Sequence, residues 1–245
     1  MKGFFVAGTD TGVGKTEIAR AICFSLAHKG LQPVALKPVE TGCDPERPLD
    51  ALALRAACGS SQPLDDVCPY RFRLPAAPLV AAEEEGAHVD LLRIEQIVDR
   101  ARTPIVVEAA GGLLVPLTRE QLSLDQTDPA DRPPAQAIVT NLDLADRLRL
   151  PVVLVARAGL GTLNHCALSV EALERRGLPI AAVVLNRTVP EDDPTVAINA
   201  RWLIEMTGAQ VLGPGPFVAD AAERPAALAH LVARLLSGLE GERAR

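Results

Sequence analysis

The sequence predicts an α/β fold in which helices flank a mainly parallel central sheet. Short apolar runs rich in Val, Ile and Leu recur along the chain, at residues 4–7, 33–37, 104–108, 151–156, 179–186 and 209–212. In these runs apolar residues occupy both alternating sets of positions, as in parallel strands that are covered on both faces. Segments with helical spacing lie between them, at residues 18–29, 50–57, about 90–101, 163–176, 194–207 and 225–239. Such alternation predicts βαβ units.

The length and composition favour one domain over residues 1–245. With 48% hydrophobic residues, 245 residues suffice to bury the core of a single three-layer domain. Two segments do not fit the alternation. Residues 119–141 form a long connection, expected to be an insertion loop because 125–136 is rich in Pro and Asp. Residues 240–245 are charged and expected to be a disordered tail.

The charge and the cysteines exclude several classes of protein. A net charge of −6 without a run of Lys or Arg argues against nucleic acid or an anionic membrane as a partner. No apolar stretch approaches the ~20 residues of a membrane span, and the first residues lead into a strand, so we expect a cytoplasmic location. The five cysteines form no Cys-x-x-Cys pair and the four histidines are scattered, which favours neither disulfides nor a zinc site. The expected ligands are small molecules.

A glycine-rich run separates the first predicted strand from the first predicted helix, with the sequence GTDTGVGKT at residues 8–16. Glycines allow backbone N–H groups to converge on a polyphosphate, and the start of the helix adds partial positive charge. In such a loop Lys15 reaches the β- and γ-phosphates and the Thr16 hydroxyl binds Mg²⁺. Five residues separate Gly8 from Gly14, one more than usual. The run predicts a P-loop NTPase fold that binds a nucleoside triphosphate and Mg²⁺, with nucleotide contacts at Gly12, Val13, Gly14, Lys15, Thr16 and Glu17.

Three further residues lie at positions suited to phosphoryl transfer. Glu108 ends the strand predicted at 104–108, where a carboxylate would meet the metal of a bound triphosphate, unless it is simply a solvated acid. Asp50 stands at the start of a predicted helix, so it could equally be an N-cap or a metal ligand. Lys37 closes the second strand and could place a second positive charge near the transferred phosphoryl group, or be an ordinary surface lysine.

Six motifs together give the chain a resemblance that no single spacing provides. They are GTDTGVGKT at 8–16, KPVETG at 37–42, DALAL at 50–54, EAAGGLLVPL at 108–117, GTLNH at 161–165 and VLN at 184–186. In order and spacing, residues 1 to about 217 resemble the dethiobiotin synthetase family. One departure is Ala109, which stands where the family commonly has a glycine and would crowd a backbone that needs a positive φ.

The resemblance implies a homodimeric enzyme of biotin biosynthesis. It implies that 7,8-diaminononanoate, CO₂ and MgATP are converted to dethiobiotin, ADP and phosphate. One amine captures CO₂ as a carbamate, and a carbamate oxygen attacks the γ-phosphorus to give a carbamic–phosphoric anhydride. The neighbouring amine then closes the cyclic urea as phosphate leaves. Every intermediate is anionic, so the reaction demands positive charge where the phosphoryl group is transferred.

The resemblance also implies roles for individual residues. Those in the reaction itself are Lys15, Lys37 and Thr11. Substrate is bound by Thr11, Lys37 and Thr41, and across the subunit interface by Gly161, Leu163 and Asn164. Magnesium is held by Thr16, Asp50 and Glu108. The adenine base is bound by Asn186 and by the main chain at Pro216.

Two other classes share the P-loop variant. Partition-type ATPases work as nucleotide-controlled dimer switches, but they usually carry an extra lysine near the start of the loop, where this chain has Asp10. Cobyrinic and cobyric acid amide synthases normally require a glutamine amidotransferase domain with a nucleophilic cysteine, and we expect none in 245 residues. The combination of motifs therefore favours the dethiobiotin synthetase resemblance.

Overall fold

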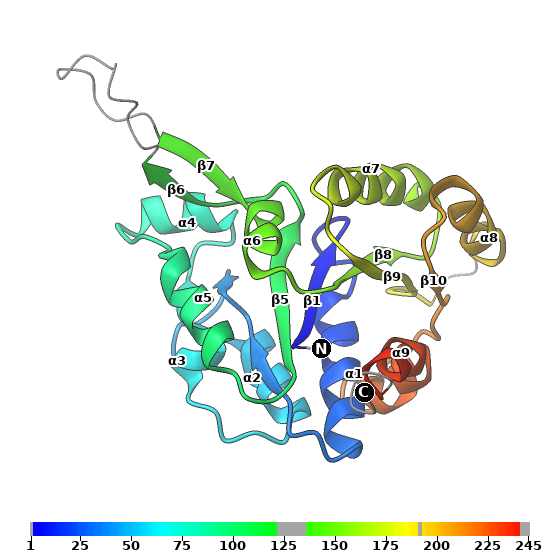
Figure 1. The fold of residues 1–245 in the computed structure, drawn as a ribbon, viewed down its shortest axis with the longest axis horizontal. Helices are drawn as coiled ribbons and strands as arrows, with labels where there is room; N and C mark the ends of the chain where they lie inside the picture. Colours follow the sequence, from blue (N-terminus) through cyan, green and yellow to red (C-terminus); the bar gives the residue numbers. More distant parts are fainter. Residues whose placement is uncertain (1, 122–135, 191–192, 241–245) are drawn as a thin grey trace.

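The computed structural model describes residues 2–121, 136–190 and 193–240. Its centre is a parallel sheet of six strands in the order β10-β9-β8-β1-β5-β2 (Figure 1). The strands are β1 (Gly3–Gly8), β2 (Val34–Leu36), β5 (Ile105–Gly112), β8 (Val152–Arg157), β9 (Ile180–Asn186) and β10 (Val211–Leu212). Each falls on one of the six predicted strand segments, so the predicted α/β class is confirmed.

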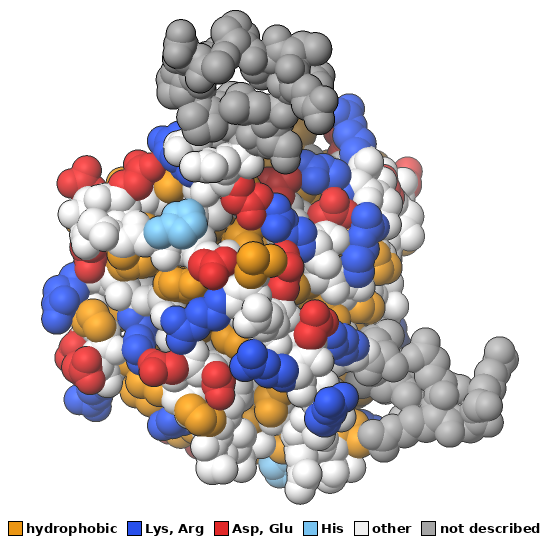
Figure 2. Space-filling model, turned by 60° about the vertical axis from the view of Figure 1, so that its left-hand side comes forward, with side chains coloured by type: hydrophobic (Ala, Val, Ile, Leu, Met, Phe, Trp, Pro, Cys, Tyr) orange, Lys and Arg blue, Asp and Glu red, His pale blue; other side chains and the backbone are white. Residues whose placement is uncertain are grey.

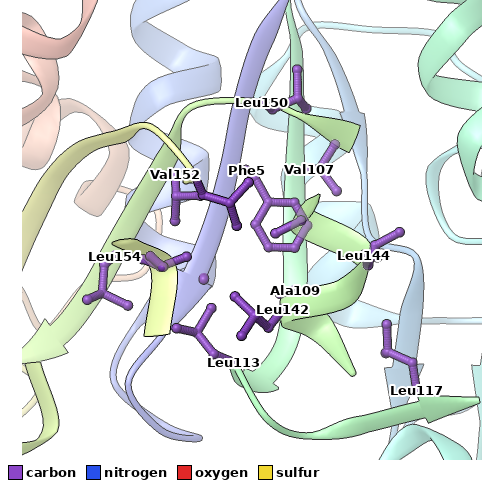
Figure 3. Close-up of a cluster of buried hydrophobic side chains, with 14 of the residues drawn as sticks. Phe5, Val107, Ala109, Leu113, Leu117, Leu142, Leu144, Leu150, Val152 and Leu154 are labelled. Carbon is purple, nitrogen blue, oxygen red and sulfur yellow. The ribbon is translucent and has the colours of Figure 1, made fainter. Parts of the chain in front are cut away.

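Helices cover both faces of this sheet, which gives three layers (Figure 1). One face carries α5 (Leu91–Arg100), α6 (Asn141–Leu148), α7 (Thr162–Arg175) and α8 (Val196–Thr207). The other carries α1 (Lys15–His28), α2 (Leu49–Ala57) and α9 (Arg224–Glu240). Successive residues of β1 point to opposite layers, since Phe5 packs in the first cluster (Figure 3) and Phe4 in the second. Both apolar sets of β1 are therefore buried, as the sequence pattern requires.

The strand order places a binding site beside β1. From β1 the chain crosses over β5 to the edge strand β2, whereas β8, β9 and β10 follow on the other side of β1. In open α/β sheets, ligands bind beyond the carboxyl ends of the strands where the order reverses. The glycine-rich loop after β1 lies at this point.

The edge strand β2 is closed by side-chain and loop groups. The Gln62 amide accepts a hydrogen bond from the Ala35 N–H (3.2 Å) and donates one to the Ala35 carbonyl (3.0 Å). The Lys37 N–H donates to the Val67 carbonyl (2.6 Å). These contacts satisfy backbone groups that would otherwise face outward from the edge of the sheet.

Several short elements lie outside the predicted alternation. They are β3 (Val39–Thr41), β4 (Tyr70–Phe72), α3 (Leu64–Val67), α4 (Pro78–Glu84), β6 (Pro116–Gln121) and β7 (Gln136–Thr140), together with α6. Strands β6 and β7 form an antiparallel pair at the ends of the segment 119–141, and Leu117 and Val139 anchor the pair in the core. The expected insertion loop is thus strand at both ends, and its residues 122–135 lie outside the described part. In the expected tail 240–245, Glu240 ends α9, and residues 241–245 lie outside the described part.

A capping box begins α6. The Thr140 N–H and hydroxyl donate to one oxygen of the Asp143 carboxylate (2.8 and 2.7 Å), and Arg176 donates to the other (2.8 Å). The Asp143 N–H donates back to the Thr140 hydroxyl (3.4 Å). Partial burial opposes the charged form of Asp143, but these hydrogen bonds outweigh it and hold its pKa below the usual value.

We expect Asp143→Asn to lower the free energy of unfolding by about 1 kcal/mol at neutral pH, the usual worth of a helix cap. Because the carboxyl pKa is lowered in the folded protein, this contribution is present above the ordinary aspartate pKa and is lost as the pH falls through the lowered one. Urea unfolding across the acid range measures it. The difference between the wild type and the variant should shrink toward zero at low pH, whereas Asp99→Asn, which breaks an exposed pair with Lys2, should change little. A constant difference at every pH would contradict this role of Asp143.

On the side that carries α4 and α5, Lys and Arg are interspersed with Asp and Glu (Figure 2). This face thus shows no large area of one charge. Among the described helices, none has the length and apolar character to cross a membrane.

Candidate active site

A cleft of about 790 Å³ opens beyond the carboxyl ends of β1 and β5. It brings together most of the residues singled out in the sequence: Thr11, Gly12, Gly14, Lys15, Thr16, Glu17, Lys37, Thr41, Asp50, Glu108, Asn186 and Pro216. They come from segments far apart along the chain. The carboxyl edge of the sheet therefore gathers them as the fold class predicts.

The glycine-rich loop leaves the start of α1 open to a ligand. Gly12 and Gly14 have φ values of 74° and 87°, which favour glycine. A Cβ atom on Gly14 would lie 2.0 Å from Asn186 Nδ2, so a larger residue there would displace the Asn186 side chain. Helix α1 has no side-chain cap at its N-terminus, so its first N–H groups are available to an anion. Val13 is the exception among the loop residues named in the sequence, since its side chain is buried in the core below α1.

A compact ion cluster lies beneath the loop. The Thr16 hydroxyl donates to Glu108 Oε1 (2.8 Å), and the Lys37 ammonium group pairs with the same oxygen. Lys37 also donates to Asp50 Oδ2 (3.2 Å). Glu108 is fully buried, and Lys37 is only 5% exposed. The alternatives of a solvated acid at Glu108 and an ordinary surface lysine at Lys37 are therefore wrong.

The two lysines of the cleft differ in their electrostatics. Burial lowers the pKa of Lys37, but Glu108 and Asp50 outweigh it and hold the pKa above its ordinary value, so Lys37 stays charged. Burial and the neighbouring Lys37 lower the pKa of Lys15 to about 8. The Lys15 ammonium group donates to the Asp10 carbonyl (2.9 Å). A polyphosphate in the loop would favour the charged form of Lys15 because it brings negative charge next to it.

Glu108 does not end its strand, as the sequence analysis expected. Strand β5 continues to Gly112, and Glu108 lies opposite Val6 of β1 in mid-strand. After Glu108 the register with β1 shifts, and Gly112 pairs with Gly8. Ala109 packs in the core (Figure 3), and the positive φ of this segment is at Gly111 (77°). The crowding expected at Ala109 is therefore absent.

Glu40 is a site residue that the sequence analysis missed. Its carboxylate accepts hydrogen bonds from the N–H groups of Asp50 (3.2 Å) and Ala51 (3.0 Å) at the start of α2. Asp50 is the second helical residue, and Pro48 holds the N-cap position, so the interpretation of Asp50 as the N-cap is wrong. The Asp50 side chain is left free to pair with Lys37. Burial raises the pKa of Glu40.

We expect Glu40→Ala to lower the free energy of unfolding by about 1 kcal/mol, since two N–H groups of α2 lose their acceptor. Because the backbone of Asp50 is then less well fixed, the Mg²⁺ concentration for half-maximal activity should rise as well. Urea unfolding and a Mg²⁺ titration measure the two effects. Glu40→Gln keeps one acceptor oxygen, so its free energy of unfolding and its Mg²⁺ requirement should lie between those of Glu40→Ala and the wild type. Glu46→Ala, on the exposed loop, is the control and should change neither quantity. An unchanged Mg²⁺ requirement in Glu40→Ala would contradict this role.

Asn186 ends β9 against the glycine-rich loop. Its side-chain N–H donates to the Val13 carbonyl (3.2 Å), and the residue is 4% exposed. One donor is therefore engaged by the loop. Beyond Asn186, the wall of the cleft is formed by Pro216, Phe217 and Val218.

Gly161, Leu163 and Asn164 do not line the cleft. They lie at the N-terminal end of α7, where Gly161 has a φ of 89° and Asn164 is exposed. The adjacent Leu160 is 79% exposed. Within a single chain the structure therefore does not bring this loop to the other predicted site residues.

The donor set suits magnesium better than a softer metal. No group of three or more His, Cys, Asp or Glu able to hold a metal occurs within the described ranges. Magnesium needs fewer protein ligands, because it is usually held by one or two carboxylates together with phosphates of the substrate. Glu108 Oε2 is buried and has no hydrogen-bond partner, which fits a carboxylate that awaits a cation. Asp50 and the Thr16 hydroxyl complete an all-oxygen set beside it.

The chain as a whole is similar to proteins of known family. Residues 2–224 match a family model described as an AAA domain. The chain is 48% identical over 239 residues to the ATP-dependent dethiobiotin synthetase BioD of Anaeromyxobacter dehalogenans (strain 2CP-C), which covers 95% of this chain and 98% of that protein. It is 33% identical over 226 residues to the protein of the same name from Thermodesulfovibrio yellowstonii, and the match covers 89% of this chain and 90% of that protein.

Among solved structures, the fold resembles that of the MinD cell division protein of Aquifex aeolicus. The TM-score is 0.55 at 13% identity, and the match covers 98% of both chains. At this identity the likeness concerns the fold alone. It supports the three-layer P-loop architecture and carries no argument about activity.

Proposed function

Since the chain belongs to the ATP-dependent dethiobiotin synthetase family, we propose that it converts 7,8-diaminononanoate, CO₂ and MgATP to dethiobiotin, ADP and phosphate. The observation that carries the proposal is the convergence of Lys15, Lys37, Thr16, Asp50 and Glu108 in one cleft. A simple nucleotide switch gives no reason for the buried Lys37 beside the loop. A carbamate that attacks a phosphoryl group does, because negative charge gathers between the two lysines.

In this proposal one amine of the diamine attacks CO₂ and loses a proton, which gives a carbamate. A carbamate oxygen attacks the γ-phosphorus and ADP leaves. The second amine then attacks the carbamoyl carbon, a proton is lost, and phosphate departs with the electrons of the broken C–O bond. Each step brings together groups that repel one another in water or have little attraction for one another, so the site must hold them close.

The glycine-rich loop and Lys15 bind the β- and γ-phosphates in this proposal. The open N-terminus of α1 and the positive φ at Gly12 and Gly14 support this role. Lys37 lines the same cleft and pairs with Glu108, which also accepts from the Thr16 hydroxyl. Its positive charge is therefore close to the end of the cleft where the γ-phosphate lies in this proposal. Thr11 and Thr41 line the same cleft and have hydroxyl groups to hold the carbamate.

Thr16, Asp50 and Glu108 are the residues that would hold Mg²⁺. When bound, this ion neutralises charge on the phosphate oxygens as they are transferred. The buried, unpartnered oxygen of Glu108 supports the assignment. Glu40 supports it indirectly, since it fixes the backbone at Asp50.

Asn186 and the wall at Pro216 bind the adenine base in this proposal. The Asn186 amide donates to the Val13 carbonyl, so its oxygen remains to accept a hydrogen bond from the adenine amino group. Apolar groups of Phe217 and Val218 line the wall beside it. A flat base suits such a surface.

A homodimer completes the substrate site in this proposal, with Gly161, Leu163 and Asn164 of one subunit facing the cleft of the other. A small-molecule substrate site and a cytoplasmic location are part of it. The exposed Leu160 and the separation of this loop from its own cleft support a role toward a second copy. The uncapped start of α7 suits the distal carboxylate of the diamine.

We expect Asn164→Ala to raise the KM for the diamine about tenfold, since one hydrogen bond to a charged group is lost. The KM for ATP should stay unchanged, because Asn164 does not line the nucleotide cleft of its own chain. Steady-state kinetics with each substrate varied in turn distinguish the two. A rise in the ATP KM alone would count against the substrate role of this loop.

The decisive test of the function is to incubate the protein with 7,8-diaminononanoate, bicarbonate and MgATP. We expect the cyclic urea by mass spectrometry, with ADP formed in equal amount. Omission of the diamine should abolish phosphate release. Release that persists without the diamine, with no cyclic urea formed in its presence, would point to the dimer-switch class instead.

A further inference from the structure

The loop after β10, residues 213–223, forms the wall of the cleft at the base end. Pro216, Phe217 and Val218 of this loop line the cleft, whereas the phosphate end is formed by the glycine-rich loop and α1. The two ends belong to segments about 200 residues apart. Their spacing must suit one nucleotide, so contacts between them matter for binding.

The first half of the loop is fixed to the sheet. The Gly215 N–H donates to the Leu185 carbonyl at the end of β9 (3.1 Å). A Cβ atom on Gly215 would lie 2.6 Å from the Leu231 side chain of α9, so the backbone packs directly on that helix. This half needs no further anchor.

In the second half of the loop, the Arg224 side chain binds two backbone carbonyls. Its Nε donates to the Val218 carbonyl (2.7 Å) and its Nη2 to the Ala219 carbonyl (3.0 Å). Its Nη1 pairs with Glu17 Oε1 (3.1 Å) in the first turn of α1. All three nitrogens of the guanidinium group are thus engaged, and they join the base wall to the helix of the phosphate site.

Arg20 supports the same contact from α1. It pairs with the other oxygen of Glu17 (3.1 Å) and donates to the Ala221 carbonyl (2.9 Å). The Glu17 carboxylate therefore lies between two arginines. Both of its oxygens have partners in the protein, which gives this side chain a role in the support of the loop. The nucleotide contact expected at Glu17 stays a prediction.

We propose that Arg224 is a positioning residue for nucleotide binding, which sets the distance between the base wall and the phosphate loop through Glu17. The inference rests on the proposed function only in that the cleft binds a nucleotide. A planar guanidinium group is required, because a lysine ammonium group cannot reach two carbonyls and a carboxylate from one position.

The test compares two probes in calorimetry, MgADP and inorganic tripolyphosphate with Mg²⁺. MgADP engages both ends of the cleft, whereas tripolyphosphate engages the phosphate end alone. We expect Arg224→Ala to raise the Kd for MgADP about tenfold, equivalent to about 1.4 kcal/mol. The Kd for tripolyphosphate should stay within about twofold of the wild-type value, and kcat at saturating ATP should be little changed. Arg224→Lys should also raise the Kd for MgADP.

Control variants separate this role from a loss of folding. Arg175→Ala on α7 breaks only an exposed pair with Glu171 and should leave both Kd values unchanged. Thermal unfolding checks that each variant folds. If Arg224→Ala does not fold, the Kd values of Arg224→Lys test the proposal in its place. An unchanged Kd for MgADP in a folded variant overturns the proposal. Equal weakening of both probes also overturns it, since Arg224 would then act on the phosphates. MgADP binding by wild-type protein that makes no cyclic urea would refute the proposed function alone.

Discussion

Replacement of Lys15 by alanine should lower kcat/KM for ATP by about 10²–10³-fold, the usual loss when a positioned donor to the transition state is removed. The Lys15 side chain lies in the cleft at the start of α1, and its ammonium group is held by the Asp10 carbonyl. Among the residues that line the cleft, the other lysine is Lys37. Turnover of the diamine with MgATP, followed by ADP release, measures the effect.

The stability of Lys15→Ala provides the control. Burial lowers the pKa of Lys15 to about 8, so the charged lysine is disfavoured in the folded protein without ligand. Its removal should leave the free energy of unfolding little changed or slightly higher below pH 8. Lys2→Ala, which breaks an exposed ion pair, should change neither turnover nor stability. Near-wild-type turnover in folded Lys15→Ala would exclude Lys15 from the phosphoryl site.

Lys37→Ala should have a second large effect, on stability as well as on turnover. Lys37 pairs with the buried Glu108 and with Asp50, so its loss leaves the buried Glu108 carboxylate without a positive charge beside it. Breaking a buried pair in this way costs about 3–5 kcal/mol. Turnover should fall by about 10²–10³-fold, because the second positive charge at the phosphoryl group is gone. Urea unfolding and steady-state kinetics measure the two losses separately.

A double variant separates the two effects of Lys37. Lys37→Ala with Glu108→Ala removes both buried charges, so part of the stability should return while turnover stays low. Magnesium gives a second check, since a cation next to Glu108 and Asp50 can replace the lost ammonium charge. Mg²⁺ should therefore raise the Tm of Lys37→Ala more than that of the wild type. A Tm that Mg²⁺ does not change in either protein would contradict the metal assignment at Glu108.

The strands of the central sheet could be predicted because each is buried on both faces. Runs such as 151–156 are apolar at every position, and this local pattern leaves few alternatives to a parallel strand. The short elements between them could not be predicted in the same way. Strands β3, β4, β6 and β7 have three to six residues each, and their pairing depends on partners that no local pattern reveals. The capping box at Thr140 and Asp143 was a usable signal for α6, since a Thr-x-x-Asp sequence precedes apolar residues.

In the site, sequence motifs identified residues whose chemistry is visible locally, such as Lys15 and Thr16 in the glycine-rich loop. They did not identify residues that act through distant backbone groups. Glu40 caps a helix that begins nine residues later, and Arg224 reaches Glu17 across 207 positions. Neither contact follows a periodicity, because each depends on how the sheet and its helices are packed. Glu108 shows a third case, where the residue was identified but its strand extends further than expected.

The side chain of Gln62 has a consequence for how copies of this protein can meet. By binding both backbone groups of Ala35, it takes the place of a neighbouring strand, and the contact from Lys37 to Val67 closes the next position. An unpaired strand at the border of a sheet is a template on which another molecule can add its own strand. That template is absent at β2. The sheet of another molecule therefore cannot extend this sheet at its β2 edge.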